Sequence, residues 1–188
     1  VKEVLLPDYT TNTAVFKRLL DAIETEGCTV TQAVPHDSFT IDSVLFSVLG
    51  PIQSDYEDLN NASAVLRMQY GTVSFLFTGD AEKKAEQDIL QSFSDAPLHS
   101  DVLKVGHHGS STSSHDAFLE AVCPEYAVIS CAYQNEYGHP NEKTLQRLRG
   151  IHAKILRTDQ NGTVVFETNG SSLRCRAERS VNTLFANH

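Results

Sequence analysis

The stretch Asp101-Val102-Leu103-Lys104-Val105-Gly106-His107-His108-Gly109-Ser110 carries the most information about the fold of this chain. Residues 102–105 form a short, mostly apolar run, which predicts a buried strand. Two adjacent histidines flanked by glycines follow directly, and side-chain packing does not explain such a pair. Neutral imidazole is a common ligand for zinc and similar metals. We therefore interpret this strand and the loop after it as part of a functional site.

A hydroxyl-rich run, residues 111–114, continues the histidine loop. Two roles are open for it. The hydroxyl groups can donate hydrogen bonds to the phosphate oxygens of a ligand. Alternatively, Ser113 or Ser114 caps the next helix, with Asp116 at capping-box spacing from Ser113.

Two more loops with reactive side chains directly follow predicted strands, where a rigid strand aims the loop. The loop Thr78-Gly79-Asp80 follows a strand over residues 72–77, and Asp80 is either a metal ligand or the N-cap of the helix that begins just after it. The loop of residues 135–141 follows a strand over residues 126–131. In it, His139 is a ligand, an acid or base, or a residue with no chemical role, and Asn141 is expected to cap a helix.

Strand-like and helix-like segments alternate along the chain, and we expect one compact α/β unit. Strands are predicted at 1–6, 28–34, 44–49, 63–69, 72–77, 102–105, 126–131, 153–157, 163–168 and 172–176. The last two are joined by a turn at Asn169-Gly170. Neither the G-x-S-x-G motif of serine hydrolases nor a glycine-rich phosphate loop is present.

The composition excludes some classes of function. The 188 residues carry a formal net charge of −9, which argues against a broad nucleic-acid surface unless bound metal ions supply local positive charge. No apolar run reaches the length of about 18 residues that a membrane span requires. The four cysteines lack C-x-x-C spacing, which favours buried free thiols over a structural zinc site.

Taken in order, these motifs resemble the metallo-β-lactamase domain of ComEC-type competence proteins. The matching stretches are Asn60-Asn61-Ala62-Ser63, residues 77–82, residues 101–110, Ala127-Val128-Ile129-Ser130, Asn135 with Tyr137-Gly138-His139-Pro140, and Arg157-Thr158-Asp159 leading to Gly162. The resemblance implies an α/β fold, the metallo-β-lactamase-like four-layer αβ/βα sandwich, of which this chain would hold mainly the second half.

The resemblance also implies roles for single residues. It makes Asp80 a metal ligand that can bridge two ions, and it makes the histidine pair the source of a further ligand, for which we favour His108. His107 and His139 would contact the substrate or carry protons. One or two zinc ions, or manganese, would activate water for hydrolysis of phosphodiester bonds, as in a nuclease or phosphodiesterase, with DNA as a candidate substrate.

The chain departs from the family pattern because it contains no H-x-H-x-D-H block, which supplies up to four ligands in that superfamily. We expect residues 1–176 to be the C-terminal portion of the domain and 177–188 a tail, with a first half of about 80–100 residues preceding Val1. The resemblance points to an extracellular or cell-surface protein. The alternatives are a non-catalytic binding module that lost its metals and a hydrolase of another ester, such as a phosphocholine ester.

Overall fold

A mixed seven-stranded sheet dominates the computed structural model, which describes residues 1–94 and 98–179. Its strands, in spatial order, are β3 (Ser38–Ile41), β4 (Val44–Gly50), β5 (Val65–Tyr70), β6 (Val73–Phe77), β7 (Val102–Lys104), β8 (Tyr126–Ile129) and β9 (Lys154–Arg157). Pairing is antiparallel from β3 to β6 and parallel from β6 to β9. The parallel half therefore has all its carboxyl ends at one edge.

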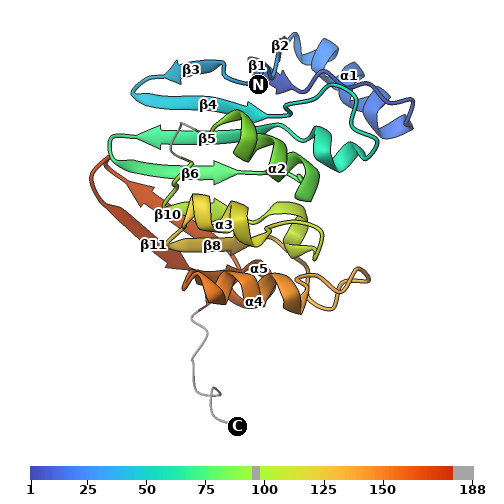
Figure 1. Cartoon of the computed structure of the whole chain (residues 1–188). Coiled ribbons are helices and arrows are strands. Elements are labelled where there is room, and N and C mark those ends of the chain that lie inside the picture. Colours follow the sequence, from blue (N-terminus) through green and yellow to red (C-terminus); the bar gives the residue numbers. More distant parts are fainter. Residues whose placement is uncertain (95–97, 180–188) are drawn as a thin grey trace.

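Three helices cover one face of this sheet (Figure 1), namely α2 (Lys83–Ser92), α3 (Asp116–Val122) and α4 (Glu142–Gly150). Each connects two neighbouring parallel strands, as the chain alternation predicts. The main core lies between the two layers, where strand residues such as Leu76 and Leu103 pack with Ile89 and Phe118 of the helices. These observations confirm the predicted α/β class and show one sheet layer packed against one helix layer.

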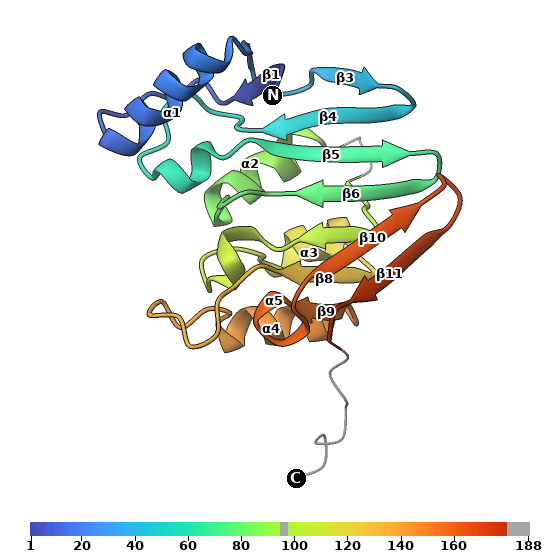
Figure 2. The same ribbon diagram turned by 180° about the vertical axis from the view of Figure 1, so that it is seen from behind.

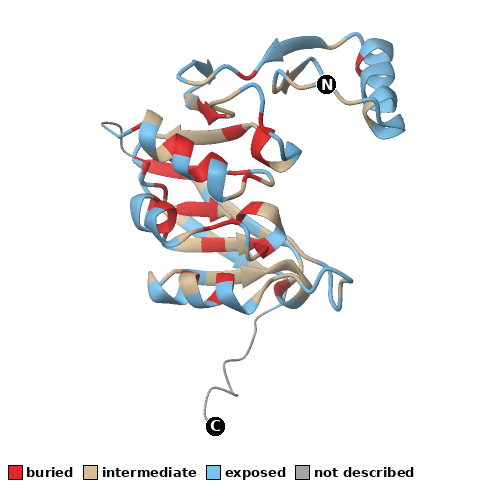
Figure 3. Cartoon of the chain, turned by 45° about the vertical axis from the view of Figure 1, so that its right-hand side comes forward, coloured by how far each residue is buried: buried red, intermediate tan, exposed pale blue. Residues whose placement is uncertain are grey.

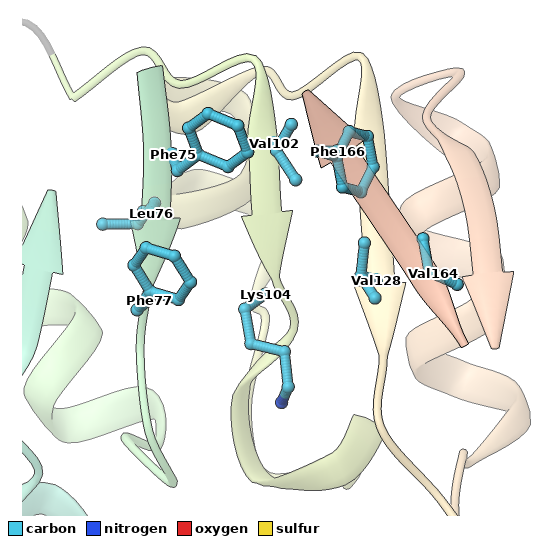
Figure 4. A pocket seen from close by; sticks show the side chains of 8 residues that line it. All are labelled: Phe75, Leu76, Phe77, Val102, Lys104, Val128, Val164 and Phe166. Atoms are coloured by element: carbon cyan, nitrogen blue, oxygen red, sulfur yellow. The ribbon is translucent and has the colours of Figure 1, made fainter. Parts of the chain in front are cut away.

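A hairpin crosses the opposite face of the sheet (Figure 2). It consists of β10 (Val164–Thr168) and β11 (Leu173–Ala177), and the predicted Asn169-Gly170 turn joins them. Phe166 makes edge-to-face contacts with Phe75 and Tyr126, which fixes the hairpin on the sheet. Beside it, an open apolar groove is lined by Phe75, Leu76, Phe77, Val102, Lys104, Val128, Val164 and Phe166 (Figure 4).

The first part of the chain forms a small unit of its own at one end of the sheet (Figure 1). It contains β1 (Glu3–Leu6), α1 (Ala14–Glu26) and β2 (Thr29–Gln32), with β1 and β2 paired in parallel. Thr13 caps α1 by accepting a hydrogen bond from the Phe16 backbone at 3.2 Å, and Gly27, with φ 64°, ends it. Most of this unit is exposed (Figure 3).

Several sequence predictions need correction or comment. Strand β3 and the short helices η1 (Leu59–Ala62), η2 (Gly106–Gly109) and α5 (Thr158–Asn161) were not expected. All four cysteines are free, as predicted, but none is fully buried: Cys123 is exposed, and the other three are partly exposed. In the predicted tail, Ala177 ends β11, and residues 180–188 lie outside the described part of the chain. No helix in the described ranges has the length and apolarity needed to cross a membrane.

Candidate functional site

The candidate site lies at one edge of the large sheet, where the neighbouring strands β6, β7 and β8 end. The three strands run parallel and side by side (Figure 4), with residues such as Leu76, Leu103 and Ala127 in register. Their carboxyl ends therefore meet, and so do the three loops that follow them. This arrangement confirms that each of the three loops follows a strand, and it shows in addition that the three strands are neighbours.

Asp80 is placed by a tight turn after β6. Its backbone N–H donates to Oγ of Ser63 at 3.0 Å. Gly79 has φ 55°, and a Cβ atom there would lie only 2.9 Å from Cβ of Ser63, so this close approach requires glycine. The Asp80 side chain is 45% exposed and faces the histidine loop.

Asp80 does not cap α2, so this alternative is wrong. The helix begins at Lys83, and its N-cap residue, Glu82, makes no capping bond with its side chain. The buried Asn61 does this work instead. Its Oδ1 atom accepts hydrogen bonds from the backbone N–H groups of Glu82 at 3.2 Å and Ala85 at 3.0 Å. The Asp80 carboxylate is thereby left available to the site.

His108 is oriented by the end of the neighbouring strand. Its Nδ1 atom lies 2.8 Å from the carbonyl oxygen of Ser130. A carbonyl only accepts hydrogen bonds, so Nδ1 carries a proton, and in the neutral form of the ring Nε2 is the nitrogen with the lone pair. Nε2 lies 3.8 Å from Oδ1 of Asp80. The structure thus brings an available imidazole nitrogen next to the carboxylate.

His107 has a different partner. Its Nδ1 atom lies 3.0 Å from Oε1 of Glu82, an oxygen that also accepts from the Thr112 hydroxyl at 2.7 Å and from Asn60 Nδ2 at 3.4 Å. Both histidines have left-handed backbones, with φ 46° for His107 and 54° for His108. Such a backbone costs about 1–3 kcal/mol at each non-glycine residue and is concentrated at functional sites.

His139 lies beside His107, with their rings edge to face and their centroids 5.7 Å apart. Its Nδ1 atom is buried and has no hydrogen-bond partner among the described residues. Burial, together with the nearby His107 and His108, lowers the pKa of His139, and Asp80 opposes this only partly. His139 is therefore held as neutral imidazole, the form that can accept a proton.

The hydroxyl groups of Thr112 and Ser113 already have partners within the protein, which argues against the phosphate-binding role for these two residues. Ser113 and Ser114 are buried, and the Ser113 hydroxyl donates to the carbonyl of Gly106 at 2.8 Å. The hydroxyls of Ser110 and Thr112 bond to each other at 2.9 Å. Arg147 of α4 also donates to the carbonyl of Ser113 at 3.0 Å. Ser113 thus links the histidine loop, through Gly106, to α4.

The predicted cap of α3 is also wrong, because neither serine caps the helix with its side chain. The buried carboxylate of Glu86 accepts the backbone N–H of Ser114 and, at 3.0 Å, that of His115. Burial raises the pKa of Glu86 to about 7, although these hydrogen bonds act in the opposite direction. Asn141 does cap α4, accepting from the Lys143 backbone at 3.0 Å, as predicted.

A metal ion fits this site in donor chemistry, because carboxylate and imidazole are both ligands of zinc and manganese. Asp80 and His108 are the residues that would hold it. Zinc in proteins usually has three or four protein ligands. Within residues 1–94 and 98–179, no group of three or more His, Cys, Asp or Glu side chains could hold a metal ion. The pair therefore accounts for only part of a coordination shell.

Sequence reasoning missed the residues that orient the site, namely Asn61, Glu82, Glu86 and Ser130. Glu82 belongs to a motif that the sequence analysis identified, two positions after Asp80, but no local signal indicated that it would contact His107. Asn61 precedes Ala85 by 24 residues and Glu86 precedes Ser114 by 28. Such partners become visible only once the chain has folded.

Comparison with known proteins places the chain. No family model matches the sequence. ComE operon protein 3 of Bacillus subtilis is 37% identical over 166 residues, covering 88% of this chain and 21% of that protein. Competence protein ComA of Neisseria gonorrhoeae is 44% identical over 125 residues, covering 66% of this chain and 18% of that protein. Recombination protein 2 of Haemophilus influenzae is 34% identical over 119 residues, covering 63% of this chain and 15% of that protein.

The chain thus spans about a fifth or less of the length of these relatives. Among solved structures, a mutant of CmlA beta-hydroxylase, which has a metallo-β-lactamase fold, matches with a TM-score of 0.52 and 13% identity, covering 82% of this chain and 38% of that one. At this identity the match shows a shared fold alone. The chain is therefore homologous to a segment of the ComEC-type competence proteins, and its fold is metallo-β-lactamase-like.

Proposed function

We propose that this chain is part of a metal-dependent hydrolase that cuts phosphodiester bonds. The observation that carries the proposal is the approach of His108 Nε2 to within 3.8 Å of Oδ1 of Asp80. The Ser130 carbonyl fixes the ring so that the lone pair of Nε2 faces the carboxylate. Zinc or manganese bound there would supply Lewis acidity and activate a water molecule for attack on phosphorus.

The remaining residues of the site have roles in handling the substrate. His107, held by Glu82, presents its Nε2 atom for contact with a phosphate oxygen. His139, kept neutral by burial and by the two other histidines, is suited to take a proton. The proposal requires metal ligands in addition to Asp80 and His108, and the greater length of the relatives leaves room for them.

DNA is the substrate that we favour, and a location on the cell surface or outside the cell is part of the proposal. The support comes from the relatives, two of which are named for the ComE operon or for competence and one for recombination. The net charge of −9 means that any phosphate binding must be local, at the metal and the histidines.

The test is elemental analysis of the full-length protein, with an Asp80→Ala, His108→Ala double variant beside it. We expect about one or two zinc or manganese ions per chain, with a clear loss in the double variant. His99→Ala is the matched control, because that exposed histidine lies just before β7, at the opposite edge of the sheet. A protein that takes up no metal under any loading condition is a binding module, and the hydrolase proposal fails.

A substrate screen follows on the metal-loaded protein. Cleavage of phosphodiester bonds that depends on both Asp80 and metal supports the proposal. Cleavage of a phosphocholine ester with no cleavage of nucleic acid would replace it by the alternative ester hydrolase, since this fold alone does not specify a substrate.

A further inference from the structure

The loop between β8 and α4 carries two strongly exposed tyrosines beside the candidate site. Tyr137 is 79% exposed and Tyr133 is 73% exposed, the highest values for aromatic side chains in the described part of the chain. Exposed rings of this kind next to a site are candidates for binding, because an aromatic face gains free energy when it is covered.

The loop holds Tyr137 in a fixed place. Nδ2 of Asn135 donates to the carbonyls of Ala132 at 2.9 Å and His139 at 2.5 Å. Oδ1 of the same side chain accepts the backbone N–H of His139 at 3.0 Å. One asparagine thus ties together both ends of the segment that carries Tyr137, and the ring is presented without a large loss of loop entropy on binding.

The Tyr137 ring is the outer member of a row of rings that leads into the site. It stacks on His139, with centroids 5.9 Å apart and planes 22° from parallel. His139 in turn meets the edge of His107 at 5.7 Å. Tyr137 therefore contacts His139 at one side, and most of its ring, including the face turned away from His139, is open to solvent.

We infer that the open face of Tyr137 stacks a nucleobase of the substrate, next to the phosphodiester group that is cut. The inference rests on the proposed function and makes Tyr137 a substrate-binding residue for it. A quaternary ammonium group such as choline is usually enclosed by several rings. Tyr133 makes no ring contact with Tyr137 in the described structure, so the site offers one flat face, which suits a flat base.

The charge of the chain does not supply affinity for nucleic acid, so another contact must. The chain has a net charge of −9, and the exposed Glu136 precedes Tyr137 directly, so the rim of the site does not attract phosphate groups. Stacking of a base on an aromatic ring is largely independent of charge and of base identity. Tyr137 would thus give affinity for a nucleic acid strand that the electrostatics of this chain do not provide.

The first test is photocross-linking of the full-length protein to a single-stranded oligonucleotide that carries 5-iodouracil, followed by mass spectrometry. We expect the cross-link on Tyr137. We also expect Tyr137→Leu to weaken oligonucleotide binding about tenfold and Tyr137→Phe to keep it, because the ring and not the hydroxyl makes the contact. Tyr133→Leu, on the same loop and similarly exposed, is the matched control and should bind like the wild type.

Other outcomes overturn the inference. These are equal binding by the wild type and Tyr137→Leu, equal binding of an abasic oligomer of the same length, and displacement of the oligonucleotide by choline. Neither cross-linking nor binding requires hydrolysis, so the two proposals fail separately. Metal-dependent cleavage without a Tyr137 cross-link sinks this inference alone. A Tyr137 cross-link without any cleavage supports base recognition and contradicts the proposal that the protein is a hydrolase.

Discussion

Oε1 of Glu82 lies 3.0 Å from Nδ1 of His107, and the carboxylate is only 16% exposed. Because a carboxylate only accepts hydrogen bonds, Nδ1 carries the proton that faces Glu82, and this contact holds the ring in one orientation. Removing the partner that orients a metal-ligating histidine typically costs about 10–100-fold in activity, and we take the same scale for His107. Glu82 is thus the positioning residue for His107, although it sits where a helix cap would normally be.

The first prediction concerns Glu82. Glu82→Ala should lower kcat of the proposed hydrolase about 10–100-fold, and Glu82→Gln should lower it less, because glutamine keeps an acceptor oxygen. Glu120→Gln, an exposed carboxylate on α3, is the control for a change of charge. Nitrogen chemical shifts of His107 supply a readout that simple destabilisation would not move. Unchanged shifts and unchanged kcat in Glu82→Ala would show that Glu82 does not orient the ring.

The second prediction concerns the pH dependence of stability. Burial raises the pKa of Glu86 from 4.5 to about 7 in the folded protein. The folded state therefore binds a proton more tightly than the unfolded state. Protonated Glu86 therefore contributes to the free energy of unfolding. This contribution is complete below pH 4.5 and is lost as the pH rises to about 7. The loss amounts to roughly 3 kcal/mol at 1.36 kcal/mol for each pKa unit.

Glu86→Gln separates this effect from hydrogen bonding. Glutamine has one acceptor oxygen for the two backbone N–H groups of Ser114 and His115, so the variant should be less stable by about 1–3 kcal/mol at pH 5. Its free energy of unfolding should nevertheless stay flatter between pH 5 and about 7, because the amide does not titrate. Urea denaturation at several pH values measures both quantities. Parallel curves for the two proteins would contradict the raised pKa.

The third prediction concerns the packing of two loops at the site. Gly109 has φ 83°, and a Cβ atom there would lie 2.7 Å from Cβ of Pro140. Gly109→Ala therefore combines backbone strain with a clash, and should cost more than the roughly 1–3 kcal/mol of strain alone. Gly138→Ala is the matched control, because Gly138 has φ 65° but open space around its Cβ position. Equal losses of stability in the two variants, measured by denaturation, would rule out the clash.

The sequence predicts the frame of this site better than its details. Apolar runs followed by Gly79 or Gly106 identified the strand ends, because a buried strand and a tight turn leave local signals. The adjacency of β6, β7 and β8 then brought Asp80 and His108 together. The caps of α2 and α3 were wrong, because local side chains competed there with partners far along the chain that no local pattern contains.

The last prediction concerns one of these distant partners. Asn61 is 6% exposed, and its Oδ1 atom accepts hydrogen bonds from the backbone N–H groups of Glu82 and Ala85 at the start of α2. Asn61→Ala leaves both groups without this partner and should reduce the free energy of unfolding by about 1–3 kcal/mol. Asn61→Asp keeps acceptor oxygens beside the positive end of the helix and should lose less.

The neighbouring Asn60 provides the control for Asn61. The only hydrogen bond that its side chain makes among the described residues is a long one, 3.4 Å from Nδ2 to Oε1 of Glu82, so Asn60→Ala should change stability by less than about 0.5 kcal/mol. Helix α2 begins at Lys83, three residues after Asp80. Fraying of its first turn should therefore also loosen Asp80. We therefore expect Asn61→Ala, and not Asn60→Ala, to weaken metal binding. Equal metal affinity in the two variants would mean that Ser63 alone holds the Asp80 loop in place.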